Sequence, residues 1–548
     1  MTFIKKYHYV LFFSAWTLIN FFQAANTVLL NDEAYYWVYS NFLDWGYFDH
    51  PPMIAALIKA GYFLFKNEFG VRFFIVILNT LTLLIIYNLL NRKNDILFYA
   101  IACSIALIQL GGFIAAPDIP LAFFVALFFL VYKKFLVSFS WMQSIFLGIV
   151  MALLLYSKYH GVLIIVCTII SNPALLKNKK AYVAVLIGVL LFIPHLLWQY
   201  QHGFPSIQYH LFERSESYKI SYTIEYIFGQ LLLAGPFMGW LFFIGAFKYR
   251  AKNLMERALM FSLIGIYCFF FISTFKGRVE ANWTVPAIIP LIILSHQYFI
   301  DDKKWQRILF FTVPFSLVII FFIRFYLISE NKFISIINTN EFEQNKTWAK
   351  QINNVSKGLP VAFINSYQKA SKYWFYSGIP SFSLNTPGYR RNNYNYWPVE
   401  SSMQAKPVYT ISTENPLYFM DSIKTSSGIL RGKYIDSFYS HSSVQLKADR
   451  AISLDKKRYA FLTLNMPGKS TSNLDTISQL QLYIYKDNQF SGLYDLLPVN
   501  TDIKEEKIFI TSMPVLLLTG EYSARIAITS ALAGYPSLNS TIIKMVIP

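Results

Sequence analysis

The sequence predicts a polytopic α-helical membrane protein with an extracytoplasmic C-terminal region of α/β and β structure. Of its 548 residues, 55% are hydrophobic and only 14% are charged, whereas soluble proteins carry about 25% charged residues. The mean hydropathy is +0.39, and the long apolar runs all lie before residue 329. These observations exclude a disordered chain and an ordinary cytosolic protein.

The charges and cysteines exclude two further classes. The net charge of +18 is spread along the chain, with 25 basic and 14 acidic residues up to Ile328 and 23 and 16 after it. This distribution does not form a nucleic-acid-binding tail, so no nucleic acid is expected as a partner. Cys103, Cys167 and Cys268 lie inside apolar runs, so the sequence implies no disulfide framework.

Eleven apolar runs are candidates for membrane spans, which need about 20 apolar residues. They are Tyr9–Leu30, Val71–Leu90, Ile96–Ala116, Ile119–Leu136, Trp141–Tyr156, Val162–Leu176, Tyr182–Tyr200, Tyr226–Phe247, Ala258–Phe275, Thr284–Ile300 and Ile308–Ile328. We interpret the first run as an uncleaved anchor. The interruption Ser157-Lys158-Tyr159-His160-Gly161 favours a tight hairpin between two short spans over one long helix.

The distribution of Lys and Arg supports eleven spans with the N-terminus inside. This topology places sixteen basic residues of the membrane half in inner loops and nine outside, while ten of its fourteen acids lie on the outer side. A single span through the hairpin would move the later basic clusters outside. Ionisable residues at the membrane edge are functional candidates, so the outer face is where we expect the site.

The first predicted outer loop, Asn31–Gly70, contains more than an aromatic belt requires. It opens with Asp32-Glu33, continues with aromatic residues at helical spacing, and then breaks at Tyr47-Phe48-Asp49-His50-Pro51-Pro52. Further polar motifs follow on the same face. They are Ala116-Pro117-Asp118, Ser157-Lys158-Tyr159, a loop with His210, Glu213 and Arg214, Lys276-Gly277-Arg278, and Asn282-Trp283.

In order and in position, these motifs resemble those of the GT-C glycosyltransferases that use polyprenyl-phosphate sugars. This group includes the dolichyl-phosphate-mannose protein mannosyltransferase family (family 39) and the lipid A aminoarabinose transferase. The resemblance covers residues 1 to about 330. It implies an enzyme of the bacterial inner (cytoplasmic) membrane that transfers a sugar from a polyprenyl (undecaprenyl) phosphate donor to a lipid (lipid A-like) or glycan acceptor.

Inverting transfer from such a donor requires a base for the acceptor hydroxyl and positive charge for the leaving phosphate. We predict Asp32 as the base, with Glu33 or Asp118 assisting. The predicted donor-phosphate residues are Lys158, Arg214, Lys276, Arg278, Tyr36 and Tyr47, of which Lys276 and Arg278 rank first and Arg214 last. Asn282 and Trp283 are expected to position substrate. For each Lys or Arg alone, a snorkelling surface cation is an equal alternative.

One position departs from the resemblance. The aminoarabinose transferase pattern has Glu-Lys before the two prolines, where this chain has Asp49-His50. The Lys of that pattern is thought to hold the donor phosphate. His50 could do so only when protonated, or it could bind a divalent metal with Asp49, and His210 is a further candidate. No cofactor is firmly predicted, and a metal stays an open alternative.

After Ile328 the apolar runs shorten, and we expect two periplasmic domains beyond the transmembrane domain 1–328. A strand at Leu359–Ile364 and a helix at Gln368–Tyr376 predict a small α/β domain over 329–435. Alternating runs separated by turn residues predict a β-sandwich over 436–548. The segment Tyr389-Arg390-Arg391 could contact an anionic glycan or lipid headgroup, or it could be a loop stabilised by aromatic packing.

Two alternatives to this enzyme remain. A lipid-linked-sugar flippase would need polar residues within spans, or helices broken by Gly or Pro in two halves, whereas the predicted spans are apolar to their ends. A protein O-mannosyltransferase is the alternative within the enzyme class. No Gly-rich phosphate loop or DxD carboxylate pair suggests a nucleotide-sugar donor, so the expected partners are the lipid-linked donor, the acceptor and membrane lipids.

Overall fold

The chain folds into two compact units, Met1–Phe342 and Glu343–Pro548. The computed structural model describes residues 2–210, 214, 217–329, 345–412, 421–446, 451–453, 461–465, 479–487, 489–502, 507–512, 515–529 and 535–547. The first unit contains the predicted transmembrane domain. The predicted division of the second unit at residue 435 stays a prediction.

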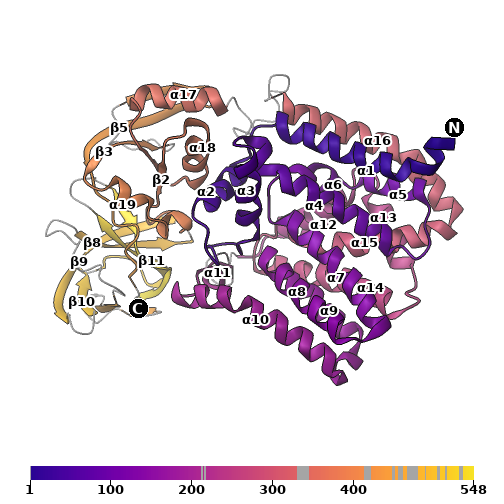
Figure 1. The fold of residues 1–548 in the computed structure, drawn as a ribbon. Helices are drawn as coiled ribbons and strands as arrows, with labels where there is room; N and C mark the ends of the chain where they lie inside the picture. Colours follow the sequence, from indigo (N-terminus) through magenta and orange to yellow (C-terminus); the bar gives the residue numbers. More distant parts are fainter. Residues whose placement is uncertain are drawn as a thin grey trace. The chain divides into compact units, whose positions relative to one another are not determined.

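The described part of the first unit consists of helices and loops (Figure 1). The longer helices are α1 (Thr2–Asn26), α4 (Glu68–Leu89), α7 (Asp118–Ser138), α8 (Trp141–Ser157), α10 (Lys179–Gln201), α12 (Ile220–Ala234), α14 (Leu254–Ser273), α15 (Val285–Asp301) and α16 (Lys303–Ile328). The shorter elements are α2 (Asn31–Asn41), α3 (Met53–Leu64), α5 (Asp95–Ser104), α6 (Ala106–Leu110), α9 (Gly161–Ser171), α11 (Pro205–Gln208), α13 (Gly239–Lys248), η1 (Gly111–Phe113), η2 (Pro173–Lys177), η4 (Thr274–Lys276) and η5 (Ala281–Thr284).

Each predicted span coincides with one of these helices or with a pair of them, which confirms the helical membrane fold. Among the described residues, six helices are long and apolar enough to cross a membrane, or up to eight if each bent pair is one span. The count of eleven therefore stays a prediction. The predicted interruption is present, because α8 ends at Ser157 and α9 begins at Gly161.

Two predicted spans are not continuous helices. The chain bends by 72° between α5 and the α6–η1 segment, and by 89° between α12 and α13. The apolar runs predicted as spans at Ile96–Ala116 and at Tyr226–Phe247 are therefore broken helices. The second break follows Gly235, whose φ of 155° is a conformation that glycine adopts without a steric penalty.

Polar residues at the span ends cap the helices that follow them. The Asn67 side chain accepts a hydrogen bond from the backbone N–H of Gly70 (3.1 Å) at the start of α4. The same role belongs to Asn94 for α5, Ser140 for α8, Asn178 for α10, Asn253 for α14 and Asp302 for α16. Such caps satisfy N–H groups that the helix leaves unpaired, so the chain itself defines where each span begins.

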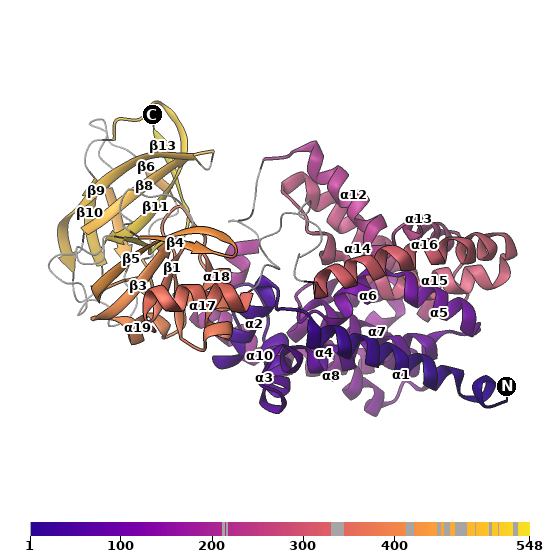
Figure 2. The same ribbon diagram turned by 90° about the horizontal axis from the view of Figure 1, so that it is seen from above.

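Helix α15 is the central helix of the first unit. Its apolar window is 83% buried, against 22% for α16. Figure 1 shows α15 among α7, α13 and α14, with α16 along the edge, and Figure 2 gives the view from above. A helix that is apolar around its circumference is buried on all sides, and this core fixes the outer ends of the helices that carry the polar motifs.

The second unit contains two sheets. The first has the order β2-β1-β3-β5-β4 and is parallel at β1–β2 and β1–β3 and antiparallel elsewhere. Its elements are β1 (Val361–Ile364), β2 (Ser381–Leu384), β3 (Lys406–Ser412), β4 (Asp421–Thr425), β5 (Gly428–Phe438), α17 (Asn345–Ser356), α18 (Tyr367–Ser377), η6 (Asn393–Asn395) and α19 (Val399–Met403). The predicted strand and helix of the α/β region are confirmed.

The second sheet has eight strands in the order β6-β13-β11-β8-β9-β10-β7, with β12 paired to β11. The strands are β6 (Ala451–Ser453), β7 (Phe461–Asn465), β8 (Gln479–Lys486), β9 (Gln489–Asp502), β10 (Lys507–Ser512), β11 (Gly520–Thr529), β12 (Pro536–Leu538) and β13 (Ile543–Ile547). The alternating runs of the sequence form strands where the structure describes them, at β7, β8, β10, β11 and β13. Hydrogen bonding joins the described strands into one sheet, and the sandwich domain over 436–548 stays a prediction.

Candidate active site

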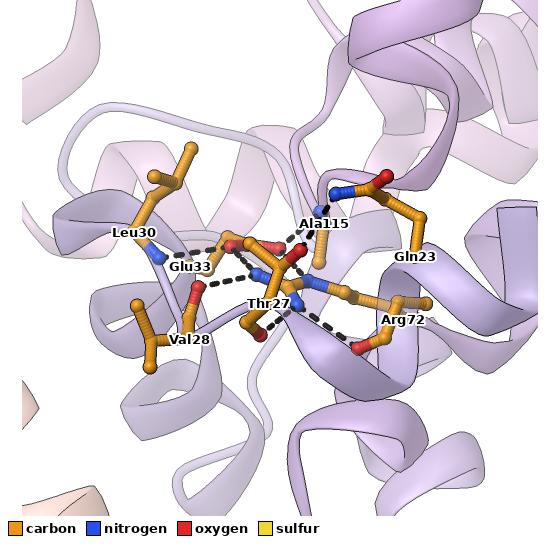
Figure 3. A network of polar contacts seen from close by, with 8 residues as sticks. Gln23, Thr27, Val28, Leu30, Glu33, Arg72 and Ala115 are labelled. Carbon is orange, nitrogen blue, oxygen red and sulfur yellow. Dashed lines mark hydrogen bonds and ion pairs between the residues drawn. The ribbon is translucent and has the colours of Figure 1, made fainter. Parts of the chain in front are cut away.

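Arg72 and Glu33 form a buried ion pair between the first turns of α4 and α2 (Figure 3). Arg72 Nε donates to Glu33 Oε1 (2.7 Å) and Nη2 to Oε2 (2.5 Å). The remaining Arg72 donors bind the carbonyls of Ala24, Thr27 and Val28 at the end of α1. The five N–H groups of this guanidinium are matched by five hydrogen bonds, so Arg72 locks the start of the outer loop.

The Glu33 carboxylate is fully engaged as well. Besides Arg72, its Oε1 accepts the backbone N–H of Ala115 (2.7 Å) and its Oε2 accepts that of Leu30 (2.9 Å). Four hydrogen bonds use the four acceptor sites of a carboxylate. These contacts do not support the predicted catalytic role of Glu33. They indicate a positioning role, because the bond to Ala115 fixes the turn that precedes Asp118.

Asp32 is the neighbour of this anchored residue and is exposed in the first turn of α2. A carboxylate at a helix N-terminus is stabilised by the helix dipole. The Glu33 anchor thus holds Asp32 at a fixed place, while the Asp32 carboxylate can be reached from solvent. This is the environment that a general base for an incoming hydroxyl requires.

Asp118, Lys158 and Asn282 meet although they come from three separate loops. Lys158 Nζ donates to Asp118 Oδ1 (2.7 Å), and Asn282 Nδ2 donates to Asp118 Oδ2 (2.9 Å). Asp118 is 8% and Lys158 5% exposed. Both charges complement a helix dipole, since Asp118 begins α7 and Lys158 caps the C-terminus of α8. The sequence predicted all three residues, and the structure brings them together.

Arg214 lies over the indole of Trp283, which adjoins Asn282. Its Cζ is 4.5 Å from the ring centroid, and Nη2 donates to Glu280 Oε1 (2.8 Å). Glu213, which the sequence places in the same loop, lies outside the described residues. A guanidinium held by one carboxylate and one aromatic face is oriented more firmly than a snorkelling side chain.

The imidazole of His160 packs against the same indole, with ring centroids 5.4 Å apart. Its Nδ1 is buried and has no hydrogen-bond partner among the described residues. Burial lowers the pKa of His160 well below its ordinary value, and the Lys158 charge lowers it further. His160 is therefore a neutral side chain with one nitrogen available to a polar ligand.

His50 lies beside Tyr36, with ring centroids 5.6 Å apart in an edge-on arrangement. Burial lowers the pKa of His50 to about 4, although the Asp49 carboxylate acts in the opposite direction. His50 is consequently neutral at pH 7 and does not supply the fixed cation that the sequence left open for it. His210 Nε2 donates to the Asp49 carbonyl (3.3 Å), which joins the later loop to the Asp-His-Pro-Pro turn.

The metal alternative gains no support from the part of the chain that the structure describes. There, no three His, Cys, Asp or Glu side chains are grouped so that they could hold a metal ion. The Asp49 carboxylate already accepts a short hydrogen bond from Tyr39.

Three residues that were predicted to bind the donor phosphate lie outside the cluster of Asp118, Lys158 and Asn282. The buried Tyr47 hydroxyl donates to the carbonyl of Phe42 (3.0 Å) within its own loop, which indicates a structural role. Lys276 is exposed, and Arg278 Nε lies 3.2 Å from Glu225 Oε2 in a pair that is more than half exposed. Exposed pairs contribute little energy to stability, so the structure orients Arg278 less firmly than Lys158, and the predicted order of the donor-phosphate residues stays a prediction.

Sequence reasoning missed Arg72, Glu280 and His160 as members of the site. Arg72 had a signal, because a cation inside an apolar run needs a partner. Glu280 was recognised only as one of many outer acids, and His160 only as part of the hairpin. Their roles depend on contacts between loops that lie far apart in the chain.

Comparisons with known proteins found a family, a curated relative and solved structures that resemble this chain. The family described as dolichyl-phosphate-mannose-protein mannosyltransferase matches residues 49–198, a stretch that contains Asp49, Asp118 and Lys158. A curated relative, the lipid A galacturonosyltransferase RgtD of Rhizobium johnstonii (strain DSM 114642 / LMG 32736 / 3841), is 25% identical over 211 residues. That match spans 36% of this chain and 44% of the relative, less than half of the relative's length.

Two solved structures share the fold. ArnT from Cupriavidus metallidurans in the apo state has a TM-score of 0.59 and 13% identity, and it covers 78% of this chain and 98% of its own. The same protein bound to undecaprenyl phosphate has a TM-score of 0.55 and 12% identity with the same coverage. These findings confirm the predicted fold class and the resemblance to GT-C glycosyltransferases that use polyprenyl-phosphate sugars.

Proposed function

We propose that this protein transfers a sugar from a polyprenyl phosphate to a lipid A-like or glycan acceptor on the outer side of the membrane, with inversion at the anomeric carbon. The observation that carries the proposal is the contact of Asp118, Lys158 and Asn282. Three of the polar motifs that resemble the GT-C pattern converge there, beside Arg214 and Trp283.

In this proposal Lys158 and Arg214 neutralise the leaving phosphate. Among its described contacts, Lys158 Nζ makes one hydrogen bond, to Asp118, whereas an ammonium has three donors. Two donors are thus available to phosphate oxygens. The pairing with Asp118 holds the ammonium in place, and fixed cations of this kind stabilise charge that develops on a leaving group.

Asp32 accepts the proton of the acceptor hydroxyl as its oxygen attacks the anomeric carbon. Glu33 and Arg72 hold Asp32 at the start of α2, and the neutral His50 and His160 offer hydrogen bonds without adding charge. If the acceptor atom is already a phosphate oxygen, no proton is removed, and Asp32 then orients the acceptor.

The polyprenyl chain is proposed to occupy a groove between α12, α13 and α14. This cavity of about 320 Å³ is lined by Tyr226, Ile227, Gln230, Leu231, Phe243, Phe247, Tyr267, Cys268 and Phe271. Gln230 connects it to the site, because its side chain donates to the carbonyl of Ala281 (3.2 Å) and accepts from the Thr284 hydroxyl. The lipid would then enter beside the turn that carries Asn282.

One observation favours a lipid-linked-sugar flippase as a second candidate. The two bent spans pack together at their breaks, where a Cβ on Gly235 would lie 2.8 Å from the carbonyl oxygen of Ser104. Broken helices that meet in this way can line a transport path. The two candidates differ in their product, since a transferase releases polyprenyl phosphate and a flippase leaves the lipid-linked sugar intact.

The test is mass spectrometry of lipids and envelope glycans from a strain that lacks this protein. We expect one lipid or glycan to lose a sugar, and the wild-type protein to restore it. A folded Asp32→Asn protein is expected to restore nothing. An unchanged set of lipids and glycans in the deletion strain would contradict the proposal, and restoration by Asp32→Asn would remove Asp32 from the mechanism.

A further inference from the structure

Arg324, near the end of α16, is a buried cation whose hydrogen bonds are incomplete. It is 8% exposed. Its Nη2 donates to Asn20 Oδ1 (2.8 Å) and to the side-chain and backbone oxygens of Gln109. Its Nε and Nη1 are buried and have no hydrogen-bond partner, and no carboxylate pairs with it among the described residues.

Arg72 provides an internal comparison. Both guanidinium groups lie near the ring of Phe113, with Cζ to centroid distances of 5.9 Å for Arg72 and 5.5 Å for Arg324. Arg72 has a carboxylate partner and five matched donors. Arg324 has no carboxylate partner among the described residues. The three N–H groups on its Nε and Nη1 bind no acceptor there. A buried charge without a counter-charge is unfavourable, so Arg324 has the properties of an anion receptor.

The surroundings of Arg324 indicate which anion would reach it. The residue lies four positions before the end of α16, about 6 Å along the helix axis at 1.5 Å per residue. This depth corresponds to lipid headgroups if α16 spans the membrane. Helix α1 adjoins α16 here, because Gln23 Nε2 donates to the Arg324 carbonyl (3.1 Å).

Large apolar side chains are exposed on both helices, close in sequence to Gln23 and to Arg324. Phe22 on α1 is 64% exposed, and Phe321 and Phe322 on α16 are 68% and 62% exposed. Such surfaces suit acyl chains, and basic sites between membrane helices bind anionic lipid headgroups. A free inorganic anion would use the guanidinium without using these apolar faces.

We infer that Arg324 binds the phosphate group of an anionic lipid whose acyl chains lie along the exposed faces of α1 and α16. The phosphate supplies both the missing acceptors and the missing negative charge. The inference shares no residue with the candidate active site and does not depend on the proposed function. A water molecule could satisfy the donors, but it would leave the charge uncompensated.

Native mass spectrometry of the full chain in nanodiscs with equal amounts of phosphatidylglycerol and phosphatidylcholine tests the inference. The wild-type protein is expected to retain phosphatidylglycerol at least tenfold more often, and Arg324→Gln is expected to lose this preference. The control is Arg307→Gln, which removes an exposed charge from the opposite end of α16. This variant is expected to keep the preference for phosphatidylglycerol. Loss of the preference in both variants, or in neither, would overturn the inference.

A second measurement identifies the source of the phosphate and does not require a folded variant. The melting temperature of the wild-type protein in detergent is measured with phosphatidylglycerol, with a phosphorylated glycolipid of lipid A type, and with inorganic phosphate. A rise with either anionic lipid and none with inorganic phosphate supports the site, and the larger rise identifies the lipid class. An equal rise with inorganic phosphate, or no rise with either lipid, would refute it.

Discussion

Lys158→Met is the most informative substitution in the candidate active site. Met has a similar length and no charge, so the variant leaves the Asp118 carboxylate buried without its cation. Lys158 and Asp118 are 5% and 8% exposed, and removal of one partner from a buried pair costs about 3–5 kcal/mol. The double variant Lys158→Met with Asp118→Asn replaces both charges, so it should be more stable than Lys158→Met alone.

The assay has two readouts, thermal unfolding and binding of the lipid donor in nanodiscs. The double variant is expected to recover most of the unfolding free energy and none of the donor binding, because the phosphate still lacks its cation. Asn282 serves as the comparison position, since Asn282→Ala removes one hydrogen bond to the Asp118 carboxylate and no charge, a loss of about 1.5–3 kcal/mol. Donor binding by folded Lys158→Met at the wild-type level would refute the phosphate role of Lys158.

The remaining predictions concern other parts of the chain. Arg72→Lys should destabilise the protein nearly as much as Arg72→Ala, measured by thermal unfolding, because an ammonium cannot replace five donors; full stability of Arg72→Lys would contradict this. The pKa of His50 is about 4 in the folded protein and near 6.5 in the unfolded chain. As the pH drops from 6.5 towards 4, the unfolded chain therefore binds the proton before the folded protein does, and the free energy of unfolding falls. His50→Gln should weaken this fall, and an unchanged stability profile would show that His50 does not contribute to it. Arg278→Ala should raise the donor KM less than twofold, since its ion pair is exposed, and a tenfold rise would restore it to the site. Labels after Lys179 should be cytoplasmic and those after Lys433 extracytoplasmic, and labels on the same side would contradict the eleven-span topology.

The fold was predictable from sequence where periodicity and composition carry the information. Apolar runs predicted the helices, whereas the caps that define their starts, such as Asn67 and Asn253, were found only in the structure. The bends at Ser104 and Gly235 were not predictable, because an apolar sequence is compatible with a straight helix and the bend depends on what packs beside it. The pairing of the C-terminal strands into one sheet is likewise a long-range property that alternation does not specify.

The candidate site was predictable residue by residue but not contact by contact. Asp118 and Lys158 were both chosen from their motifs, yet only the fold shows that they pair. Lys276 and Arg278 were ranked first because a short turn beside two spans concentrates their charge, and the structure leaves both exposed. Glu33 was predicted to assist Asp32, whereas its contact with Arg72, 39 residues away, is one that no local pattern indicates.

Release of polyprenyl phosphate tests the central claim most directly, because it does not require the sugar to be known. Purified protein in nanodiscs is given a polyprenyl-phosphate-sugar fraction from bacterial membranes together with a lipid A-like acceptor, and the free polyprenyl phosphate is measured by mass spectrometry. The proposed function predicts acceptor-dependent release by the wild-type protein and none by Asp32→Asn. Movement of the intact lipid-linked sugar across a bilayer, without release of polyprenyl phosphate, would contradict it.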